Sequence, residues 1–248
     1  MKELNVKANR SIERAFQVLN CFSIEESELS IKEFVAKTDL SRATLYRIIK
    51  TMQEIGYIQY DSSTDKYRLS IKFYQLGVIA SSDIAIQKQV APFMDELYEV
   101  TNNTILLATL RDKHLIYLDK RESEEGLKIS STVGKIREPD YGLLGKTIIG
   151  ALPEDEQVTI VDQLRLVRNN EEIEDLITKI QQVKEQDYLY MINETTKGVA
   201  GIAVPIRAQF TMSIGVLFPS FQIDEERQRV IIEKMLQIAK DITKILNE

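Results

Sequence analysis

Two helix signals separated by a very short turn constrain the fold of this sequence more than any other feature. Ser30-Ile-Lys-Glu33 has the form of a capping box, in which the serine oxygen and the glutamate carboxylate each accept a hydrogen bond from a free N–H group. This box predicts a short helix that ends near Lys37. After a turn over residues 38–40, a second helix is expected from Ser41 to about Gly56, because glycine readily adopts the left-handed conformation that ends a helix. The segment therefore predicts a helix-turn-helix.

The second of these helices has two chemically different faces. With a step of about 100° per residue, one arc collects the apolar side chains of Leu45, Ile48, Ile49 and Met52. The opposite face offers guanidinium, ammonium, phenol and hydroxyl groups, which suit DNA phosphates and base edges. A basic helix face is often only a solvated surface, and that interpretation stays open for this helix taken alone.

The segments on either side complete a recognisable arrangement. Helical spacing of apolar residues predicts a helix over residues 10–22, ahead of the helix-turn-helix, with a loop rich in Glu and Ser between them. After Gly56, YIQY and KYRLS alternate around the polar tip at residues 61–65, which predicts a hairpin. Three helices and a hairpin in this order indicate a winged helix-turn-helix.

Candidate DNA-binding residues follow from this arrangement. In the hairpin, Lys66 and Arg68 alternate with Tyr67 and Leu69, so we expect the basic pair to point outward and the apolar pair to pack inward. For that basic pair, phosphate contact and simple solvation are about equally favoured. The full set of candidates comprises Ser41, Arg42, Ala43, Thr44, Tyr46, Arg47, Lys50, Lys66 and Arg68.

The remainder of the chain predicts a second domain. Residues 70–102 read as helix, with Gly77 and Pro92 expected to interrupt it. Strands are expected at TILLATL, HLIYLDK and LKISST, and then near 188–193, 199–207 and 212–218. Helices are expected at about 142–152, 154–166, 170–186 and 223–246. The whole is therefore an α+β protein, with a DNA-binding domain over 1–78, a linker helix over 79–91 and an antiparallel sheet flanked by helices over 92–248.

Composition excludes several classes of protein. The chain of 248 residues is 44% hydrophobic and 28% charged, and it has neither a long apolar run nor an export signal at its start, so we expect a cytoplasmic protein without membrane contact. Residues 1–78 carry a net charge of +2 within a chain of net charge −6. A locally basic domain can approach DNA while the acidic remainder limits non-specific adhesion to polyanions.

No catalytic, metal or cofactor site is expected. The single cysteine, Cys21, lies on the apolar pattern of the first helix, so burial is favoured over reactivity, and one histidine leaves too few ligands for a typical zinc site. That histidine, His114, follows a turn and has no evident partner, which favours exposure over a role as a general base. Neither a nucleophile-elbow pattern nor a dinucleotide-binding loop occurs.

The ordered segments of the chain resemble the IclR-type bacterial transcriptional regulators over nearly its whole length. RSIERAFQVLNCF, SIKEFVAKTDLSRATLYRIIKTMQEIGYIQYD and KYRLSIKFYQLG are similar to the family's DNA-binding domain. VAPFMDELYEVTNNTILLA, LGKTIIGALP and ETTKGVAGIAVPI are similar to its GAF-like ligand-binding domain. The resemblance implies a homodimer or homotetramer that binds a pseudo-palindromic operator in double-stranded DNA and senses a small metabolite.

The resemblance also implies where that effector binds. It brings seven positions toward one cavity: Leu143, Leu144, Gly145, Met191, Gly201, Val216 and Phe218. Because nearly all of these side chains are apolar, we expect an apolar or aromatic effector, anchored by backbone N–H groups near Gly145 and Gly201. Three alternatives stay open: a filled core without a ligand, a sensing module that does not bind DNA, and a C-terminal domain that serves only oligomerisation.

Overall fold

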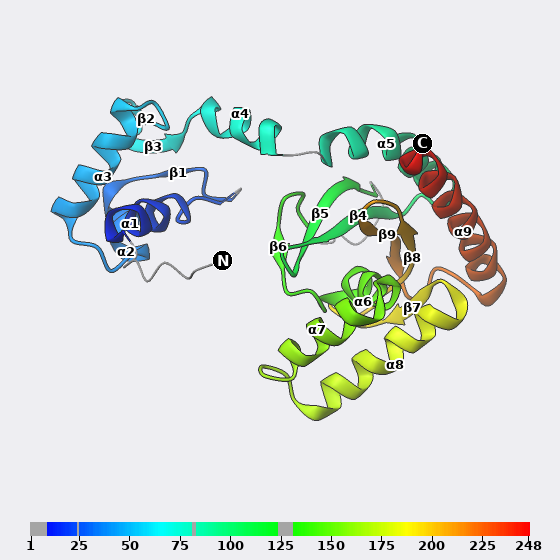
Figure 1. The fold of residues 1–248 in the computed structure, drawn as a ribbon. Helices are drawn as coiled ribbons and strands as arrows, with labels where there is room; N and C mark the ends of the chain where they lie inside the picture. The colour runs from blue at the N-terminus through cyan, green and yellow to red at the C-terminus, as the bar shows by residue number, and fades with distance from the viewer. Residues whose placement is uncertain (1–8, 24, 81–82, 124–130) are drawn as a thin grey trace. The chain divides into compact units, whose positions relative to one another are not determined.

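A computed structural model describes residues 9–23, 25–80, 83–123 and 131–248 (Figure 1). Contacts divide the chain into two compact units, residues 1–82 and 83–248. The α+β class is confirmed, with a helix-turn-helix in the first unit and an antiparallel sheet flanked by helices in the second.

The first unit is a small helical domain with a three-stranded sheet. Its elements are α1 (Arg10–Leu19), β1 (Glu28–Leu29), α2 (Ile31–Lys37), α3 (Arg42–Glu54), β2 (Ile58–Asp61), β3 (Lys66–Leu69) and α4 (Ile71–Ala80). The capping box is confirmed, because the Glu33 carboxylate accepts from the Ser30 N–H at 2.7 Å while the Ser30 hydroxyl accepts from the Glu33 N–H at 3.4 Å. Gly56 follows α3 with φ of +80°, as expected for a residue that ends a helix.

Apolar side chains from α1, α2, α3 and the three strands form one core in this unit. Fully buried members include Val18, Phe34, Leu45 and Ile49. Cys21 is buried in the same core, where desolvation raises the pKa of its thiol, and the thiol donates to the Gln17 carbonyl. The cysteine is therefore a packing residue, as its position on the apolar pattern predicts.

Two expectations for this unit are corrected. The strand β1 was expected to be loop, but it pairs with β3, with Leu29 opposite Tyr67. Leu69 was expected to pack inward beside Tyr67, yet it is exposed, because the last residue of β3 lies beyond the core that Tyr67 covers. Only the tyrosine of the apolar pair is buried.

The second unit is built on a six-stranded antiparallel sheet with the order β6-β5-β4-β9-β8-β7. Its strands are β4 (Thr104–Arg111), β5 (His114–Arg121), β6 (Ile136–Arg137), β7 (Leu189–Ile192), β8 (Val199–Arg207) and β9 (Thr211–Pro219). Its helices are α5 (Asp83–Thr101), α6 (Gly142–Ala151), α7 (Glu154–Leu164), α8 (Asn170–Gln186) and α9 (Glu225–Asn247).

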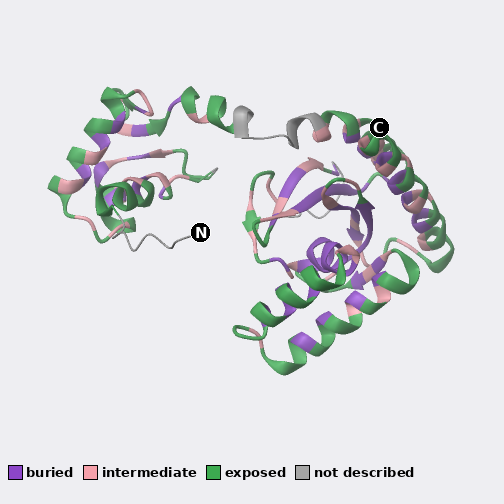
Figure 2. Ribbon diagram, viewed as in Figure 1, coloured by how far each residue is buried: buried purple, intermediate pink, exposed green. Residues whose placement is uncertain are grey.

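Helices cover both faces of this sheet (Figure 1). On one face, α5 packs on β4 and β5 and α9 packs on β8, and the core that they share includes Ile202, Ile214 and Val216. On the other face lies α6, which is buried almost throughout and is covered in turn by α8 (Figure 2). Glycines allow this close packing, since a Cβ at Gly150 would lie 2.6 Å from Val183.

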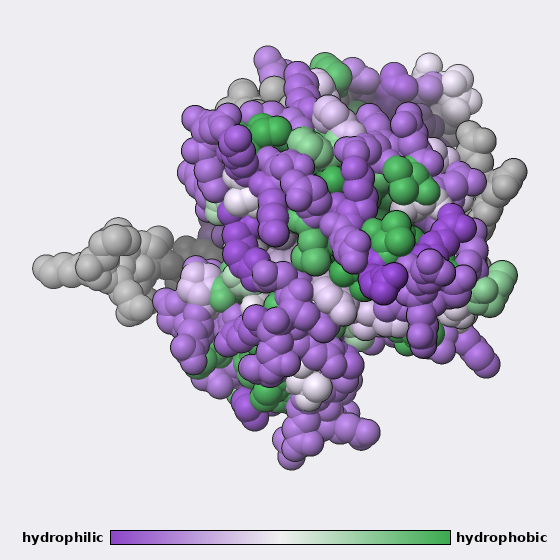
Figure 3. Space-filling model, turned by 90° about the vertical axis from the view of Figure 1, so that its right-hand side faces the viewer, coloured by the Kyte–Doolittle hydropathy of each residue, from purple (hydrophilic) through white to green (hydrophobic). Residues whose placement is uncertain are grey.

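The outward side of α9 is polar. Its buried residues recur at helical spacing at Ile231, Met235, Ile238 and Ile242 and face the sheet. The surface seen in Figure 3 is largely hydrophilic, with hydrophobic groups in separate patches. The helix is therefore amphipathic, as its sequence pattern predicts.

Several boundary expectations for this unit are wrong or fall outside the described residues. Pro92 and Gly77 do not interrupt their helices, and α5 continues through Pro92. Burial of Val90 and Met94 on either side of the proline favours the continued helix despite the loss of one backbone hydrogen bond. The strand expected at LKISST lies mostly within residues 124–130, outside the described part, and the short strand β6 was not expected.

Candidate functional sites

The helix α3 carries the first candidate site, and local sequence signals fix where it begins. Ser41 is the N-cap, and its hydroxyl accepts from the Thr44 N–H at 3.3 Å. Leu45, Ile49 and Met52 are buried beneath the helix, as its apolar stripe predicts. This anchoring turns the opposite face outward.

The basic and polar candidates on α3 lie together on that exposed face. Arg42, Tyr46, Arg47 and Lys50 are all exposed, as are Ser41 and Ala43, while Thr44 is half-buried. The Arg42 guanidinium lies 5.7 Å from the centre of the Tyr46 ring, and the Lys50 ammonium lies 3.9 Å from the Glu54 carboxylate. Both contacts are exposed and therefore weak, so the cations remain available to an anionic partner.

The hairpin of β2 and β3, which is the wing of the winged helix-turn-helix, lies beside this face. A hollow of about 370 Å³ separates α3 from β3, and its lining includes Tyr46, Arg47, Lys50 and Tyr67. The wing cations have partners within the unit, because the Lys66 ammonium lies 3.8 Å from a Glu33 carboxylate oxygen and the Arg68 Nε donates to the Gln59 amide oxygen at 3.2 Å. The first is a long, partly exposed ion pair, which an incoming phosphate can replace at low cost.

The second candidate site is a cavity in the second unit, between the first turn of α6, the sheet and the β7–β8 turn. Its volume is about 50 Å³, enough for a few water molecules. The β7–β8 turn is held by Asn193, whose side-chain oxygen accepts from the Gly198 N–H at 2.6 Å. The lining comprises Leu106, Tyr117, Ser131, Tyr141, Gly142, Leu143, Leu144, Met191, Glu194, Thr195, Thr196, Val199, Ala200, Gly201 and Leu217.

The structure brings four of the seven expected effector residues to this cavity. Leu143, Leu144, Met191 and Gly201 line it. Val216 and Phe218 do not, because they lie on the opposite face of the sheet, packed with α5 and α9. Gly145 lies inside α6 against the Pro139 carbonyl, which a Cβ at this glycine would approach to 2.4 Å.

Alternation along a strand explains the misplaced pair. Successive residues of β9 face opposite sides of the sheet, so Leu217 points toward α6 while its neighbours point away. Leu217 can be predicted as a cavity residue only if the side of β9 that faces α6 is known. The Ser213 hydroxyl donates to the Leu144 carbonyl of α6 at 3.1 Å, so Ser213 and every second residue after it face α6. A polar residue in an otherwise apolar strand was a signal that could have revealed it.

The polar lining was also missed. Burial raises the pKa of Tyr117, an effect that its hydrogen bond with Ser131 partly opposes. Glu194 and the threonines at 195 and 196 come from the turn between β7 and β8. The cavity therefore has an apolar floor and a polar rim, in contrast to the nearly uniform apolar lining that the sequence suggested.

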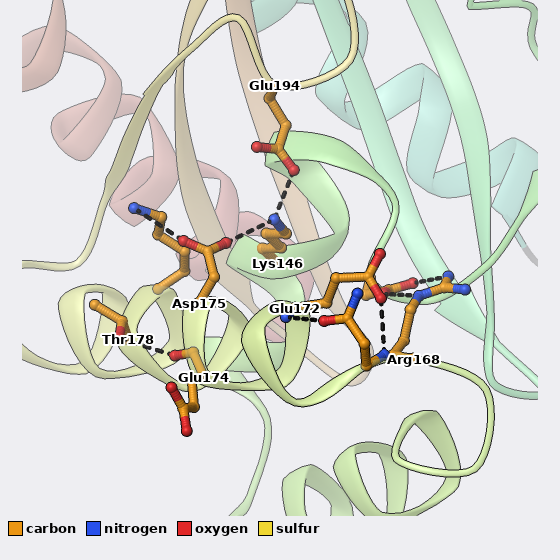
Figure 4. A network of polar contacts seen from close by, with 10 residues as sticks. Lys146, Arg168, Glu172, Glu174, Asp175, Thr178 and Glu194 are labelled. Atoms are coloured by element: carbon orange, nitrogen blue, oxygen red, sulfur yellow. Dashed lines mark hydrogen bonds and ion pairs between the residues drawn. The ribbon is translucent and has the colours of Figure 1, made fainter.

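A network of charges lies behind this rim (Figure 4). The Lys146 ammonium, on the buried helix α6, lies 2.6 Å from a Glu194 carboxylate oxygen and 3.2 Å from an Asp175 carboxylate oxygen. Burial acts to lower the pKa of Lys146, but the two carboxylates outweigh it and the pKa is raised. Beside this network, the Arg168 guanidinium binds both carboxylate oxygens of Asp140 at 2.9 Å. These contacts connect the β7–β8 turn and α8 to the helix at the cavity.

Comparison with known proteins identifies the family of both units. Residues 11–62 match the model of the IclR helix-turn-helix domain, and residues 78–244 match the model of the bacterial transcriptional regulator IclR C-terminal domain. The second match alone covers more than half of the chain. The chain belongs to the IclR family of bacterial transcriptional regulators.

Other members of the IclR family are similar over most of their length. The transcriptional regulator KdgR of Escherichia coli is 29% identical over 241 residues, covering 94% of this chain and 91% of KdgR. XynR of the same organism is 28% identical over 201 residues, covering 79% of this chain and 80% of XynR. These relatives are regulators of transcription rather than enzymes.

Solved structures share the fold. An IclR homologue from Microbacterium hydrocarbonoxydans in complex with 4-hydroxybenzoate has a TM-score of 0.81 at 17% identity, covering 95% of this chain and 98% of its own. The IclR protein of Thermotoga maritima has a TM-score of 0.76 at 18% identity, covering 96% of this chain and 99% of its own. The IclR assignment thus gives the chain a helix-turn-helix DNA-binding domain and a C-terminal ligand-binding domain.

Within residues 9–23, 25–80, 83–123 and 131–248, no three His, Cys, Asp or Glu side chains are grouped so that they could hold a metal ion. None of the helices in that part of the chain is both long and apolar enough to cross a membrane.

Proposed function

We propose that this IclR-family protein binds a pseudo-palindromic operator in double-stranded DNA as a homodimer or homotetramer, in the cytoplasm, and that a small effector in the α6 cavity controls this binding. The exposed face of α3 carries the proposal, because Arg42, Arg47 and Lys50 stand together opposite a buried apolar stripe. Helices that dock in the major groove present such a face, with the wing beside it. In this proposal residues 79–91 link the two functions.

Exposed apolar side chains in the first unit support pairing of two subunits. Ile12 and Phe16 are 56% and 59% exposed on α1, and Ile71 and Tyr74 are 74% and 69% exposed on α4. Their spacings of four and three residues place each pair on one side of its helix. Covering these faces with a second copy gives two α3 helices related by a two-fold axis, which is the symmetry of a pseudo-palindrome.

For the effector we propose a largely apolar or aromatic body with a small number of polar groups. Leu143, Leu144 and Met191 supply the apolar floor, and Glu194 with the neighbouring threonines supplies the polar side. An aromatic hydroxy acid bound to the Microbacterium homologue supports this class of ligand. The cavity of about 50 Å³ must widen to hold a ring, which the β7–β8 turn permits because most of that turn is exposed.

The test of operator binding is a mobility-shift assay with genomic fragments, using Arg47→Ala and Lys50→Ala. Each variant should fold normally, because its side chain is exposed. A lost base contact should cost about 1–3 kcal/mol and relax specificity at one position, while a lost phosphate contact should reduce the salt slope by roughly one unit. Lys240→Ala, an exposed lysine of α9, removes the same charge from the other unit and should bind DNA as the unaltered protein does.

If both α3 variants bind DNA with the affinity of the unaltered protein, α3 is not the helix that recognises the operator. No shift with any genomic fragment would favour a sensing module without DNA binding.

The effector proposal has its own assay, a thermal-shift screen with 4-hydroxybenzoate and neutral aromatic compounds. A ligand at about 100 times its Kd stabilises the folded state by about 2.7 kcal/mol. A screen without any shift would favour a C-terminal domain that serves only oligomerisation.

A further inference from the structure

The turn between α7 and α8 exposes two large apolar side chains. Leu166 is 83% exposed and Val167 is 69% exposed. Backbone hydrogen bonds continue the helical turn past the end of α7, since the Leu166 N–H donates to the Gln163 carbonyl at 3.1 Å and the Val167 N–H donates to the Leu164 carbonyl at 3.0 Å. The two side chains are therefore held in place at the end of the helix, and we call them the α7 tip.

A groove lies at the other end of the same helix. Its volume is about 500 Å³, and the first turns of α7 form one wall while the β4–β5 and β8–β9 turns form the other. Its floor is apolar, with contributions from Leu110, Leu152, Ile160 and Phe210. The Arg111 guanidinium covers the Phe210 ring at 3.4 Å from the ring centre. We call this site the α7 groove.

The tip and the groove lie along one strip of the helix surface. Asp155 and Thr159 line the groove, and Asp162 and Leu166 follow them at spacings of three and four residues, which keeps all four within an arc of about 60°. Residues four apart stack on the same side of a helix. With a rise of about 1.5 Å per residue, the tip lies roughly 18 Å from the start of the groove.

We propose that this strip is an interface between two copies of the chain, in which the α7 helices pair antiparallel and each α7 tip enters the partner's α7 groove. Two copies related by a two-fold axis make this contact twice, because each chain carries both an α7 tip and an α7 groove. This surface is separate from the α1 and α4 faces invoked for operator binding. A second copy of the chain is favoured over another partner by this self-complementarity and by charge.

The charges at the two ends of the strip are complementary. Arg165 adjoins the tip, while Asp155 and Glu156 stand at the groove. The Arg165 guanidinium lies 3.8 Å from the Asp162 carboxylate, with half of its side chain exposed, so it is available to a carboxylate of the second copy. Antiparallel pairing places the basic end of each helix beside the acidic end of the other.

The experiment is sedimentation of the full-length protein, comparing the unaltered chain with the double substitution Leu166→Ser and Val167→Ser. The double variant should have half the mass of the unaltered protein at micromolar concentration, with its Kd for this association raised roughly 100-fold or more. Val158→Ser is the matched control, because Val158 is 54% exposed on α7 but does not line the groove. The control should keep the full mass.

A charge exchange separates loss of the interface from loss of folding. Glu156→Arg alone and Arg165→Glu alone should each weaken the association, and the two together should restore it. Equal masses for the unaltered chain and the double serine variant overturn the proposal, including the case in which the groove binds only a small molecule. Operator binding by the same variants is scored separately, so a protein that fails to bind DNA still gives a decisive result for α7.

Discussion

Replacing Lys146 by methionine tests what holds the β7–β8 turn against the effector cavity. The lysine side chain is 11% exposed and contacts Glu194 on that turn and Asp175 on α8. Methionine keeps the length and the apolar stem but removes the charge, so both carboxylates lose their buried partner. Unfolding free energy should fall, and the β7–β8 turn should open more often.

The size of the effect follows from the exposure of the three groups. Breaking a fully buried ion pair costs about 3–5 kcal/mol, whereas surface pairs contribute about 0–1 kcal/mol. Because the Glu194 and Asp175 side chains are 28% and 48% exposed, water screens them in part. We therefore expect a loss of about 1–3 kcal/mol. A loss of 1 kcal/mol lowers the Tm of a domain of this size by roughly 2–4 °C.

Denaturant unfolding measures the loss, and hydrogen exchange over residues 193–198 measures opening of the turn. Asp175→Asn is the matched control, since Lys146 keeps its contact with Glu194 in that variant. It should cost less than about 1 kcal/mol and leave exchange in the turn unchanged. Adding Glu194→Gln to Lys146→Met should recover part of the loss by removing the unpaired carboxylate. Equal costs for Lys146→Met and Asp175→Asn would refute the role given to Glu194.

The pH dependence has a definite sign. The folded pKa of Lys146 is raised, so its contribution to stability is present below the unfolded value of about 10.4 and is lost as pH rises through the folded value. The stability difference between the unaltered chain and Lys146→Met should therefore stay constant from neutral pH to about pH 10 and shrink above it. A difference that vanishes near pH 8 would contradict the ion-pair explanation.

Three more predictions concern other parts of the chain. Ser30→Ala removes the N-cap of α2 and should lower the unfolding free energy of the first unit by about 0.5–2 kcal/mol, measured by denaturant titration. Hydrogen bonds from the Ser30 N–H and hydroxyl lower the pKa of Glu33, so the contribution of its carboxylate should be present above about pH 4.3 and fade as pH falls through the folded pKa. Phe218→Ala should cost about 3–5 kcal/mol, because the ring is 2% exposed, yet it should not change ligand binding in the α6 cavity, which lies across the sheet. A variant that keeps its stability and gains a ligand at position 218 would contradict this placement.

Local signals explain why the first unit could be predicted in detail. A capping box at Ser30 and Glu33, an N-cap at Ser41 and a left-handed glycine at 56 each fix a helix end through groups within four residues of one another. The apolar stripe of α3 then determines which side of the helix is exposed. Such features depend on the nearby sequence alone, so the candidate DNA-binding face could be read before the fold was known.

Pairing between distant segments was not readable in the same way. The strands β1 and β6 have two residues each, too few to show an alternation, and they exist only because β3 and β5 offer partners. Pro92 would end an isolated helix, but α5 is fixed by the sheet and α9 beneath it. In both cases contacts between distant segments determine the secondary structure, and the sequence of one segment does not show those contacts.

Two errors in the predicted lining of the effector cavity changed its expected chemistry. Selecting Val216 and Phe218 in place of Leu217 moved part of the expected lining to the other face of the sheet, and the residues of the β7–β8 turn were omitted independently. Those omitted residues are the polar ones, including Glu194. Because Glu194 also contacts the buried Lys146, a ligand that reaches the polar rim meets a carboxylate that is already paired with α6. A hydroxyl can donate to that carboxylate without displacing the lysine, whereas a ligand carboxylate placed there would be repelled. The polar groups of the effector that face Glu194 should therefore be hydrogen-bond donors, and any acidic group should lie elsewhere in the cavity.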